Sequence, residues 1–193
     1  MPYQNFAELA ATEREDLDYR ILVNKRDSEC SVLAIHGGKI EYQTSAIAAQ
    51  IAGQRHSLYK FEGIKESGNF TNLHLSSHLF DEPKAVALVE SCRICVTVHG
   101  FKERERNWVA LGGLNDRLKD LIFVNLKETG LISQTEPNPT GRFPGLDPLN
   151  IVNRSQEKGV QIEISYRLRK QLGLIPTQMQ IFGQAVRNAI SEY

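Results

Sequence analysis

One apolar run in this chain ends in a histidine and two glycines. It limits the possible folds more than any other feature of the sequence. Residues 32–35 are all apolar and are followed directly by His36, Gly37 and Gly38. A run of this length is typical of a strand that is buried on both faces of a parallel sheet. His36 then stands at the carboxyl end of that strand, which is the edge where open α/β sheets hold their ligands.

The same pattern returns later in the chain. Residues 94–98 are mostly apolar and are followed by His99 and Gly100. Because the carboxyl ends of parallel strands meet at one edge of a sheet, we expect His36 and His99 to lie close together.

Strand-like and helix-like segments alternate along the chain, without a repeat or a linker between them. This alternation predicts one α/β domain over residues 1–193, with a mostly parallel or mixed twisted sheet and helices on both faces. Residues 133–148 are rich in proline and glycine and predict a long loop. The expected strands are 19–24, 31–36, 57–61, 94–99, 108–111 and 160–165, with 72–77 also extended. The expected helices are 44–53, capped by Thr44 or Ser45, one from 81–83 onward, 115–127, a short one at 148–154, 166–172 and 177–192.

Charge and composition exclude several classes of protein. Lys and Arg number 23, and Asp and Glu also number 23. A nucleic-acid-binding protein usually has a basic excess, so nucleic acid is not expected as a partner. No apolar run approaches a membrane span and no leader pattern stands at the start, so we expect no membrane partner and a cytoplasmic location as synthesised. The three cysteines are an odd number, which argues against a disulfide framework, although Cys92 and Cys95 have redox or zinc-ribbon spacing.

The turn after His36 brings a carboxylate towards the expected histidine pair. Glu41 follows His36 by five positions, just before an expected helix. Together with His99 this makes a His, Glu, His ligand set, which is the kind that zinc hydrolases use while leaving one position open. The alternative is that His36 and Glu41 form a hydrogen-bonded pair without a metal.

Glu163 is a second carboxylate in an unexpected place. It shares a strand face with Gln161, while Val160, Ile162 and Ile164 form the other face. A charge inside a central strand is costly unless it is paired or functional. Glu163 is therefore either a general base that reaches the water on the metal or a partner of Arg167 or Arg169.

Several motifs in the same order resemble the phage and Bacillus poly-γ-glutamate hydrolases, which are zinc enzymes with a carboxypeptidase-like fold. The motifs are HGGKIE (36–41), LHLSSHLFDEP (73–83), VHGF (98–101), GGLN (112–115), DPLNIVNR (147–154) and GVQIEIS (159–165). They span about 130 residues. Family members often have glycine where this chain has Lys39, which adds a cation near the site.

The resemblance implies a site and a substrate. His36, Glu41 and His99 would bind Zn²⁺, Glu163 would be the base, and poly-γ-glutamate would be the substrate. The cleft would be lined by His74, His78, Asn153 and Arg154. His78 is alternatively an exposed histidine, and Arg93, Arg142 and Arg154 all stay open as the cation that polarises the carbonyl.

Two other functions fit parts of the sequence. A zinc deacylase or carboxypeptidase acting on a small acyl-amino acid would keep the metal and need a closed pocket. A phage-associated nucleic-acid-binding protein would place arginines on phosphate, but the chain shows no motif for it. For the polymer, the cations Lys39, Lys102, Arg104, Arg106 and Arg142 would surround the groove, or they form an ordinary surface. The oligomeric state is not fixed, so a monomer is the default, and release by lysis would bring the protein to an extracellular polymer.

Overall fold

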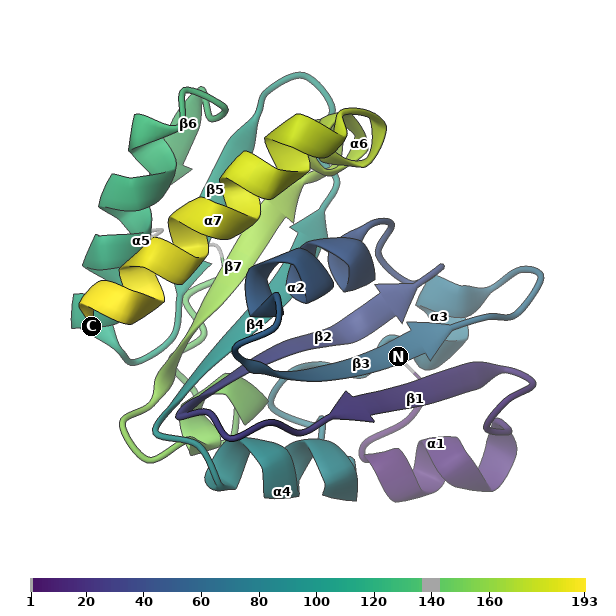
Figure 1. The fold of residues 1–193 in the computed structure, drawn as a ribbon. Helices are drawn as coiled ribbons and strands as arrows, with labels where there is room; N and C mark the ends of the chain where they lie inside the picture. The colour runs from purple at the N-terminus through teal and green to yellow at the C-terminus, as the bar shows by residue number, and fades with distance from the viewer. Residues whose placement is uncertain (1, 137–142) are drawn as a thin grey trace.

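A seven-stranded mixed sheet with helices on both faces forms the described part of the chain (Figure 1). The computed structural model describes residues 2–136 and 143–193, with only the backbone of residues 134–136. The strand order is β1-β3-β2-β4-β7-β5-β6. The strands are β1 (Tyr19–Asn24), β2 (Cys30–Gly38), β3 (Ser57–Gly63), β4 (Ile94–Phe101), β5 (Trp108–Gly112), β6 (Gln134–Glu136) and β7 (Gly159–Ser165).

Four neighbouring strands in the middle of the sheet are parallel. β3, β2, β4 and β7 pair in parallel, whereas β1 joins β3 and β5 joins β7 in antiparallel fashion. Only residues 102–107 connect β4 to β5. A connection this short cannot hold the crossover that two parallel strands require, so β5 runs the other way. The expected mixed α/β fold is confirmed.

The helices divide into two layers that bury separate apolar cores (Figure 1). One layer holds α2 (Thr44–Ala52), α5 (Asp116–Glu128), α6 (Tyr166–Leu174) and α7 (Pro176–Glu192). The other holds α1 (Phe6–Thr12), α4 (Pro83–Glu90) and the 3₁₀ turn η1 (Ile151–Arg154), and α3 (Asn69–Leu73) follows β3. Alternate residues of the strands serve the two cores, as the period of two in a strand requires. In β2, for example, Val32 and Ala34 belong to one core while Leu33 and Ile35 belong to the other.

Side-chain caps set the starts of several helices. The side chain of Asn115 accepts a hydrogen bond from Leu118 N at 3.0 Å, and that of Glu82 accepts one from Ala85 N at 2.8 Å. The start of α2 differs from the expectation that Thr44 or Ser45 caps it. The N-cap there is Gln43, in the left-handed region with φ of 72° and without a side-chain bond.

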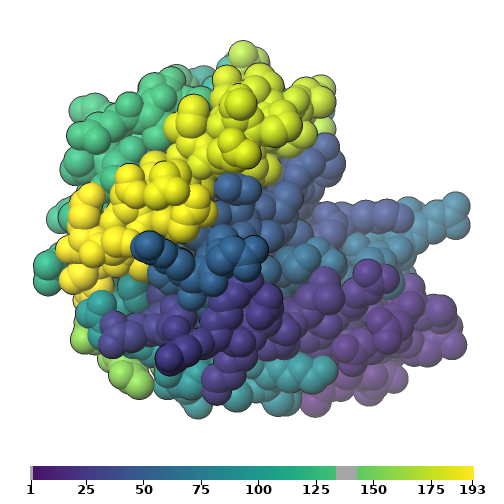
Figure 2. All heavy atoms as spheres, in the orientation of Figure 1, coloured from purple at the N-terminus to yellow at the C-terminus, as the bar shows by residue number. Residues whose placement is uncertain are grey.

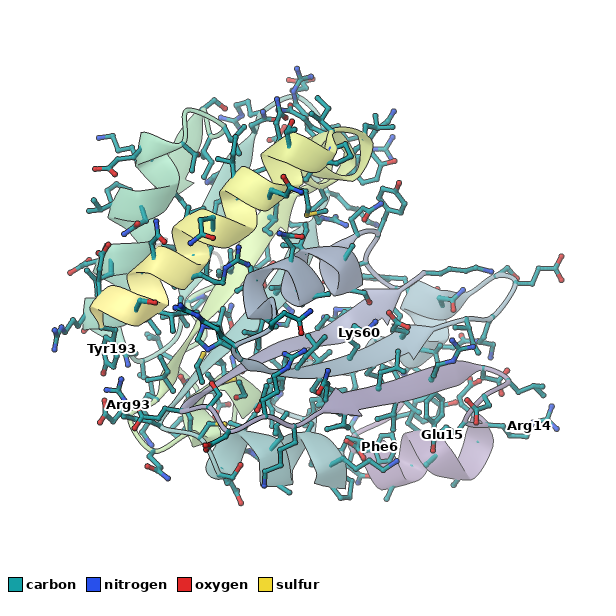
Figure 3. The ribbon with its side chains drawn as sticks, viewed as in Figure 1. Phe6, Arg14, Glu15, Lys60, Arg93 and Tyr193 are labelled. Carbon is teal, nitrogen blue, oxygen red and sulfur yellow. The ribbon has the colours of Figure 1, made fainter. Side chains whose placement is uncertain are left out.

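The carboxyl end of α7 is fastened to the edge of the sheet where β4 begins. The hydroxyl of Tyr193 donates to Glu157 Oε2 at 2.9 Å and accepts from Asn115 Nδ2 at 3.0 Å. The guanidinium of Arg93 lies over the Tyr193 ring, 4.9 Å from its centroid. Figure 3 labels both residues.

All three cysteines are free and buried. Burial raises the pKa of Cys95 to about 12 and holds the pKa of Cys30 well above its usual value. Neither Cys30 nor Cys95 is therefore prepared for thiolate chemistry. Among the described residues, no helix has the length and apolar character needed to cross a membrane.

Neighbouring side chains on α7, which lies directly against α2 in Figure 2, provide a test of the packing. Phe182 is fully buried in the core between α7 and the sheet, whereas Ile181 is 47% exposed. We expect Phe182→Ala to lower the free energy of unfolding by about 3–5 kcal/mol, because it leaves a cavity. Ile181→Ala, the matched control, should change it by less than about 0.5 kcal/mol in denaturant titrations. Equal losses in the two variants would contradict this packing.

Candidate metal centre

The ends of β2 and β4 bring His36 and His99 together, as the sequence predicts. The two strands pair in parallel as far as Leu33 and Thr97. Beyond that point His36 Nδ1 lies 3.2 Å from His99 Nδ1, and each histidine is only 2% exposed.

An irregularity in β2 aims His36 at this partner. Strict alternation would place His36 on the same face as Val32 and Ala34. The register between β2 and β3 shifts between Ala34 and Gly37. The His36 ring then lies on the other face, where its Nε2 meets the carbonyl oxygen of Leu75 at 2.8 Å. Such bulges occur next to active sites because they redirect a side chain.

A tight turn returns Glu41 to His36. Glu41 N donates to His36 O at 3.0 Å, and the Thr44 hydroxyl donates to both His36 O and Glu41 O. Gly37 permits the approach, because a Cβ there would lie 2.2 Å from Ser45 Oγ. The hydroxyls expected to cap α2 are thus used to build the turn.

The carboxylate of Glu41 is buried and held at both oxygens. Oε1 lies 3.3 Å from His36 Nδ1 and 3.4 Å from His74 Nε2, while Oε2 accepts from Gly100 N at 2.7 Å. Burial raises the pKa of Glu41, but His36 and its hydrogen bonds outweigh that effect and leave the pKa below its usual value.

His74 enters from a segment that the sequence analysis assigned wrongly. Residues 72–77 are not a strand, since α3 runs to Leu73 and His74 is its C-cap. The His74 ring stacks on that of His36, with centroids 3.8 Å apart. His36, Glu41 and His74 have ligand atoms within 4.8 Å of one another.

The donor atoms suit a metal ion. A carbonyl oxygen only accepts, so His36 Nε2 carries a proton, and in the neutral ring Nδ1 then presents a lone pair. His99 can do the same by donating from Nε2 to Thr97 Oγ1 at 3.1 Å. Tetrahedral zinc with ligands at roughly 2.0–2.2 Å places them about 3.3–3.6 Å apart. The separations of 3.2 Å between His36 and His99, 3.3 Å between His36 and Glu41, and 3.4 Å between Glu41 and His74 are close to that range.

His99 and His74 are also in the state that a metal needs. Burial, and then the charge of His36, lowers the pKa of His99 to about 3 and moves the pKa of His74 downward. Their imidazoles are thus neutral near pH 7, as ligands must be.

A cavity of about 700 Å³ opens over the centre. Glu163 lines it, 7% exposed, and stands in register with His99 on the neighbouring strand β7. His74 and the exposed His78 also line it, as do Ser76, Ser77, Asn150 and Gln161.

Asn153 and Arg154, which the resemblance places in the lining of the cleft, are not among the described residues that line this cavity. The Asn153 amide donates to Gly145 O and Asp147 O, and its oxygen accepts from Leu114 N. It thereby holds residues 145–147, which do line the cavity. Arg154 Nε donates to Leu149 O at 3.3 Å.

Of the arginines considered for the carbonyl, Arg93 is excluded. It precedes β4, at the edge opposite His99, and pairs with Glu29 and Glu157. Arg142 lies outside the described residues.

Two polar groups near the centre were missed or undervalued from the sequence. Gln161 donates to Phe143 O and accepts from Asn150, which fixes one wall of the cavity. Arg169 was considered only as a partner for Glu163. Its buried guanidinium donates to the carbonyl oxygens of Ile164, Tyr42 and Phe101, so it joins three segments beside the centre.

Comparison with known proteins now identifies the family. The sequence pattern of poly-gamma-glutamate hydrolase matches residues 3–181. The chain belongs to this family. It is 36% identical over 171 residues to the UPF0714 protein YndL of Bacillus subtilis, covering 88% of this chain and 66% of YndL. It thus spans about two thirds of the length of that relative.

Solved structures of other proteins are similar to this chain in fold. A bacteriophage poly-gamma-glutamate hydrolase superimposes with a TM-score of 0.92 at 32% identity, covering 99% of this chain and 97% of the other. A zinc-free structure of YndL gives 0.88 at 31% identity, covering 98% and 96%. A metallo-carboxypeptidase from Burkholderia cenocepacia shares the fold, with a TM-score of 0.52 at 12% identity over 89% of this chain and 59% of its own.

Thr97 offers a mild test of His99 as a ligand. Thr97→Val is nearly isosteric but removes the hydroxyl that meets His99 Nε2. If His99 binds the metal, we expect zinc affinity to fall about 10- to 100-fold, as measured by competition with a chelator. Thr71→Val, at an exposed threonine, should leave the affinity unchanged. Unaltered affinity in Thr97→Val would favour His74 as the third ligand.

Proposed function

We propose that this chain is a zinc-dependent hydrolase that cuts γ-glutamyl amide bonds in poly-γ-glutamate. The observation that carries this proposal is the convergence of His36, Glu41 and His99 beside Glu163 in an open cavity. Membership of the poly-gamma-glutamate hydrolase family supports the substrate.

The proposed ligands are His36 Nδ1, a carboxylate oxygen of Glu41 and His99 Nδ1. Both histidines have their second nitrogen engaged, at Leu75 O and Thr97 Oγ1, so their rings are oriented before a metal arrives. When bound, zinc supplies a Lewis acid that lowers the pKa of a water to about 7 and polarises a carbonyl.

Glu163 is the proposed general base. It occupies the strand position next to His99 and faces the cavity, so it can reach a water held near the ligands. Its carboxylate takes the proton of the attacking water and then gives it to the leaving amine. The nearby Gln161 is held by Asn150 and Phe143 and maintains the wall during this exchange.

His74 and His78 are the proposed contacts to the substrate within the cavity. Both line it, with Ser76 and Ser77 between them as hydroxyl donors. For Asn153 and Arg154 we propose a supporting role, since Asn153 fastens the segment 145–147 that borders the substrate.

The open shape favours a polymer over a small acyl-amino acid. The cavity shares Glu41, Phe70, Gly100 and Lys102 with a second groove of about 460 Å³. A long substrate can extend through such a passage, whereas a small substrate would be better enclosed by a closed pocket.

Metal removal tests the centre directly. We expect about one zinc per chain in the purified protein, lost together with depolymerisation of poly-γ-glutamate in His36→Ala. Chelation should abolish activity in the wild type, and added zinc should restore it. His56→Ala, at a histidine outside the cavity, should keep both metal and activity. Depolymerisation that survives full metal removal would contradict the proposal.

Glu163→Gln separates the base from the ligands. The amide keeps the shape but cannot accept the proton, so we expect kcat to fall about 10²- to 10⁴-fold. Zinc content and polymer binding should remain, as measured by metal analysis and calorimetry. Glu90→Gln, on exposed α4 surface, serves as the control. A loss of zinc in Glu163→Gln would instead assign Glu163 to the ligands.

A further inference from the structure

The metal cavity continues, past Glu41, Phe70, Gly100 and Lys102, into a line of grooves. The second groove, of about 460 Å³, adjoins a third of about 420 Å³ through Arg104 and Tyr166, which line both. The three spaces therefore form one path from the metal centre, past the start of α6, to the end of that helix near Leu174.

Five exposed cations border this path. Lys39, Lys102 and Arg104 line the second groove, and Arg104, Arg167 and Lys170 line the third. Within the residues that the structure describes, none of these five forms an ion pair. Their charges are thus available to a ligand.

Acidic side chains along the path are already compensated. Glu41 belongs to the metal centre. Glu103, beside Arg104, accepts hydrogen bonds from the backbone of Glu105 and from the guanidinium of Arg106. Cations outnumber carboxylates among the described lining residues of the second and third grooves, so these two grooves are positive.

Two of the cations lie against aromatic rings. Lys102 Nζ lies 5.5 Å from the centroid of the Phe70 ring, and the guanidinium of Arg104 lies 5.1 Å from that of Tyr166. Below them Arg169 joins Tyr42, Phe101 and Ile164, so the floor is fixed. A cation resting on a ring keeps its outward hydrogen-bond donors available.

Where the structure describes it, the other side of the metal cavity has few cations. Its described lining there includes Ser76, Ser77, His78, Leu146 and Asp147, and Lys102 supplies the cavity's one Lys or Arg among the described lining residues. Among the described lining residues, more cations therefore face a polyanion on the side of the second groove than on the side of Ser76, Ser77 and Asp147.

We propose that Lys39, Lys102, Arg104, Arg167 and Lys170 form a cationic track that binds the carboxylates of successive γ-glutamyl residues on one side of the bond that is cut. This inference rests on the proposed function. The track makes substrate length a determinant of affinity, because a longer chain reaches Arg167 and Lys170.

The test uses the two cations farthest from the metal. Neither Arg167 nor Lys170 lines the metal cavity or the second groove. Arg167→Gln/Lys170→Gln is compared with Lys25→Gln/Arg55→Gln, which removes one exposed lysine and one exposed arginine at the opposite edge of the sheet. Binding of poly-γ-glutamate to zinc-loaded protein is measured by calorimetry in the Glu163→Gln background at several salt concentrations.

We expect the track variant to bind the polymer about 3- to 30-fold more weakly, with a shallower dependence on salt. The control pair should bind as before. Activity is measured with Arg167→Gln/Lys170→Gln in a chain that keeps Glu163. There kcat/KM for a γ-glutamyl dipeptide, which is too short to reach these two positions, should stay within about twofold of the wild type, while KM for the polymer rises.

The proposed track would be contradicted if the track variant bound the polymer as well as the control pair does. It would also be contradicted if the track variant and the control pair lost binding equally. Stronger binding of single-stranded DNA than of poly-γ-glutamate, lost in the track variant, would overturn it in favour of a nucleic-acid site. A wild type that binds polymer through the track but never cleaves it, with zinc present, would refute the proposed function and leave the track standing.

Discussion

The buried carboxylate of Glu41 is the group on which the arrangement of the site depends. A charge removed from water is costly unless it is paired and hydrogen-bonded. Here it is compensated by a backbone N–H of β4 on one side and by the rings of His36 and His74 on the other. Because these groups come from separate segments, satisfying one carboxylate joins the ends of β2 and β4 to the segment after α3.

The two-layer fold explains why this meeting point lies where it does. Each face of the sheet has its own apolar core, and the strand ends between the layers are left for polar groups. The register shift in β2 then turns His36 toward the face of His99 and Glu163. A rigid sheet thus carries the reactive side chains, while loops supply the walls.

Sequence reasoning could identify most of the strands, the carboxyl-terminal helices and the pairing of His36 with His99. These follow from apolar runs, periodicity and the geometry of parallel strands. It could not see the shift at His36, since no residue type marks a bulge there. It also read the segment around His74 as extended because Leu73 and Leu75 alternate with polar residues. In fact both leucines pack in one core from a helix end and a loop.

The role of Arg169 shows a different limit. The sequence offers Arg169 only as a partner for Glu163, and only the folded chain shows its guanidinium between three carbonyl oxygens. Likewise residue spacing could predict that His36 and Glu41 lie together. The approach of His74 to the same carboxylate depends on tertiary contacts that spacing does not encode.

The three buried thiols bear on where such a protein can work. Oxidation and disulfide exchange proceed through the thiolate, and burial keeps Cys30 and Cys95 protonated. All three thiols are free and buried in the folded chain. Passage from a reducing to an oxidising medium would therefore leave Cys30 and Cys95 unreactive for as long as the chain stays folded.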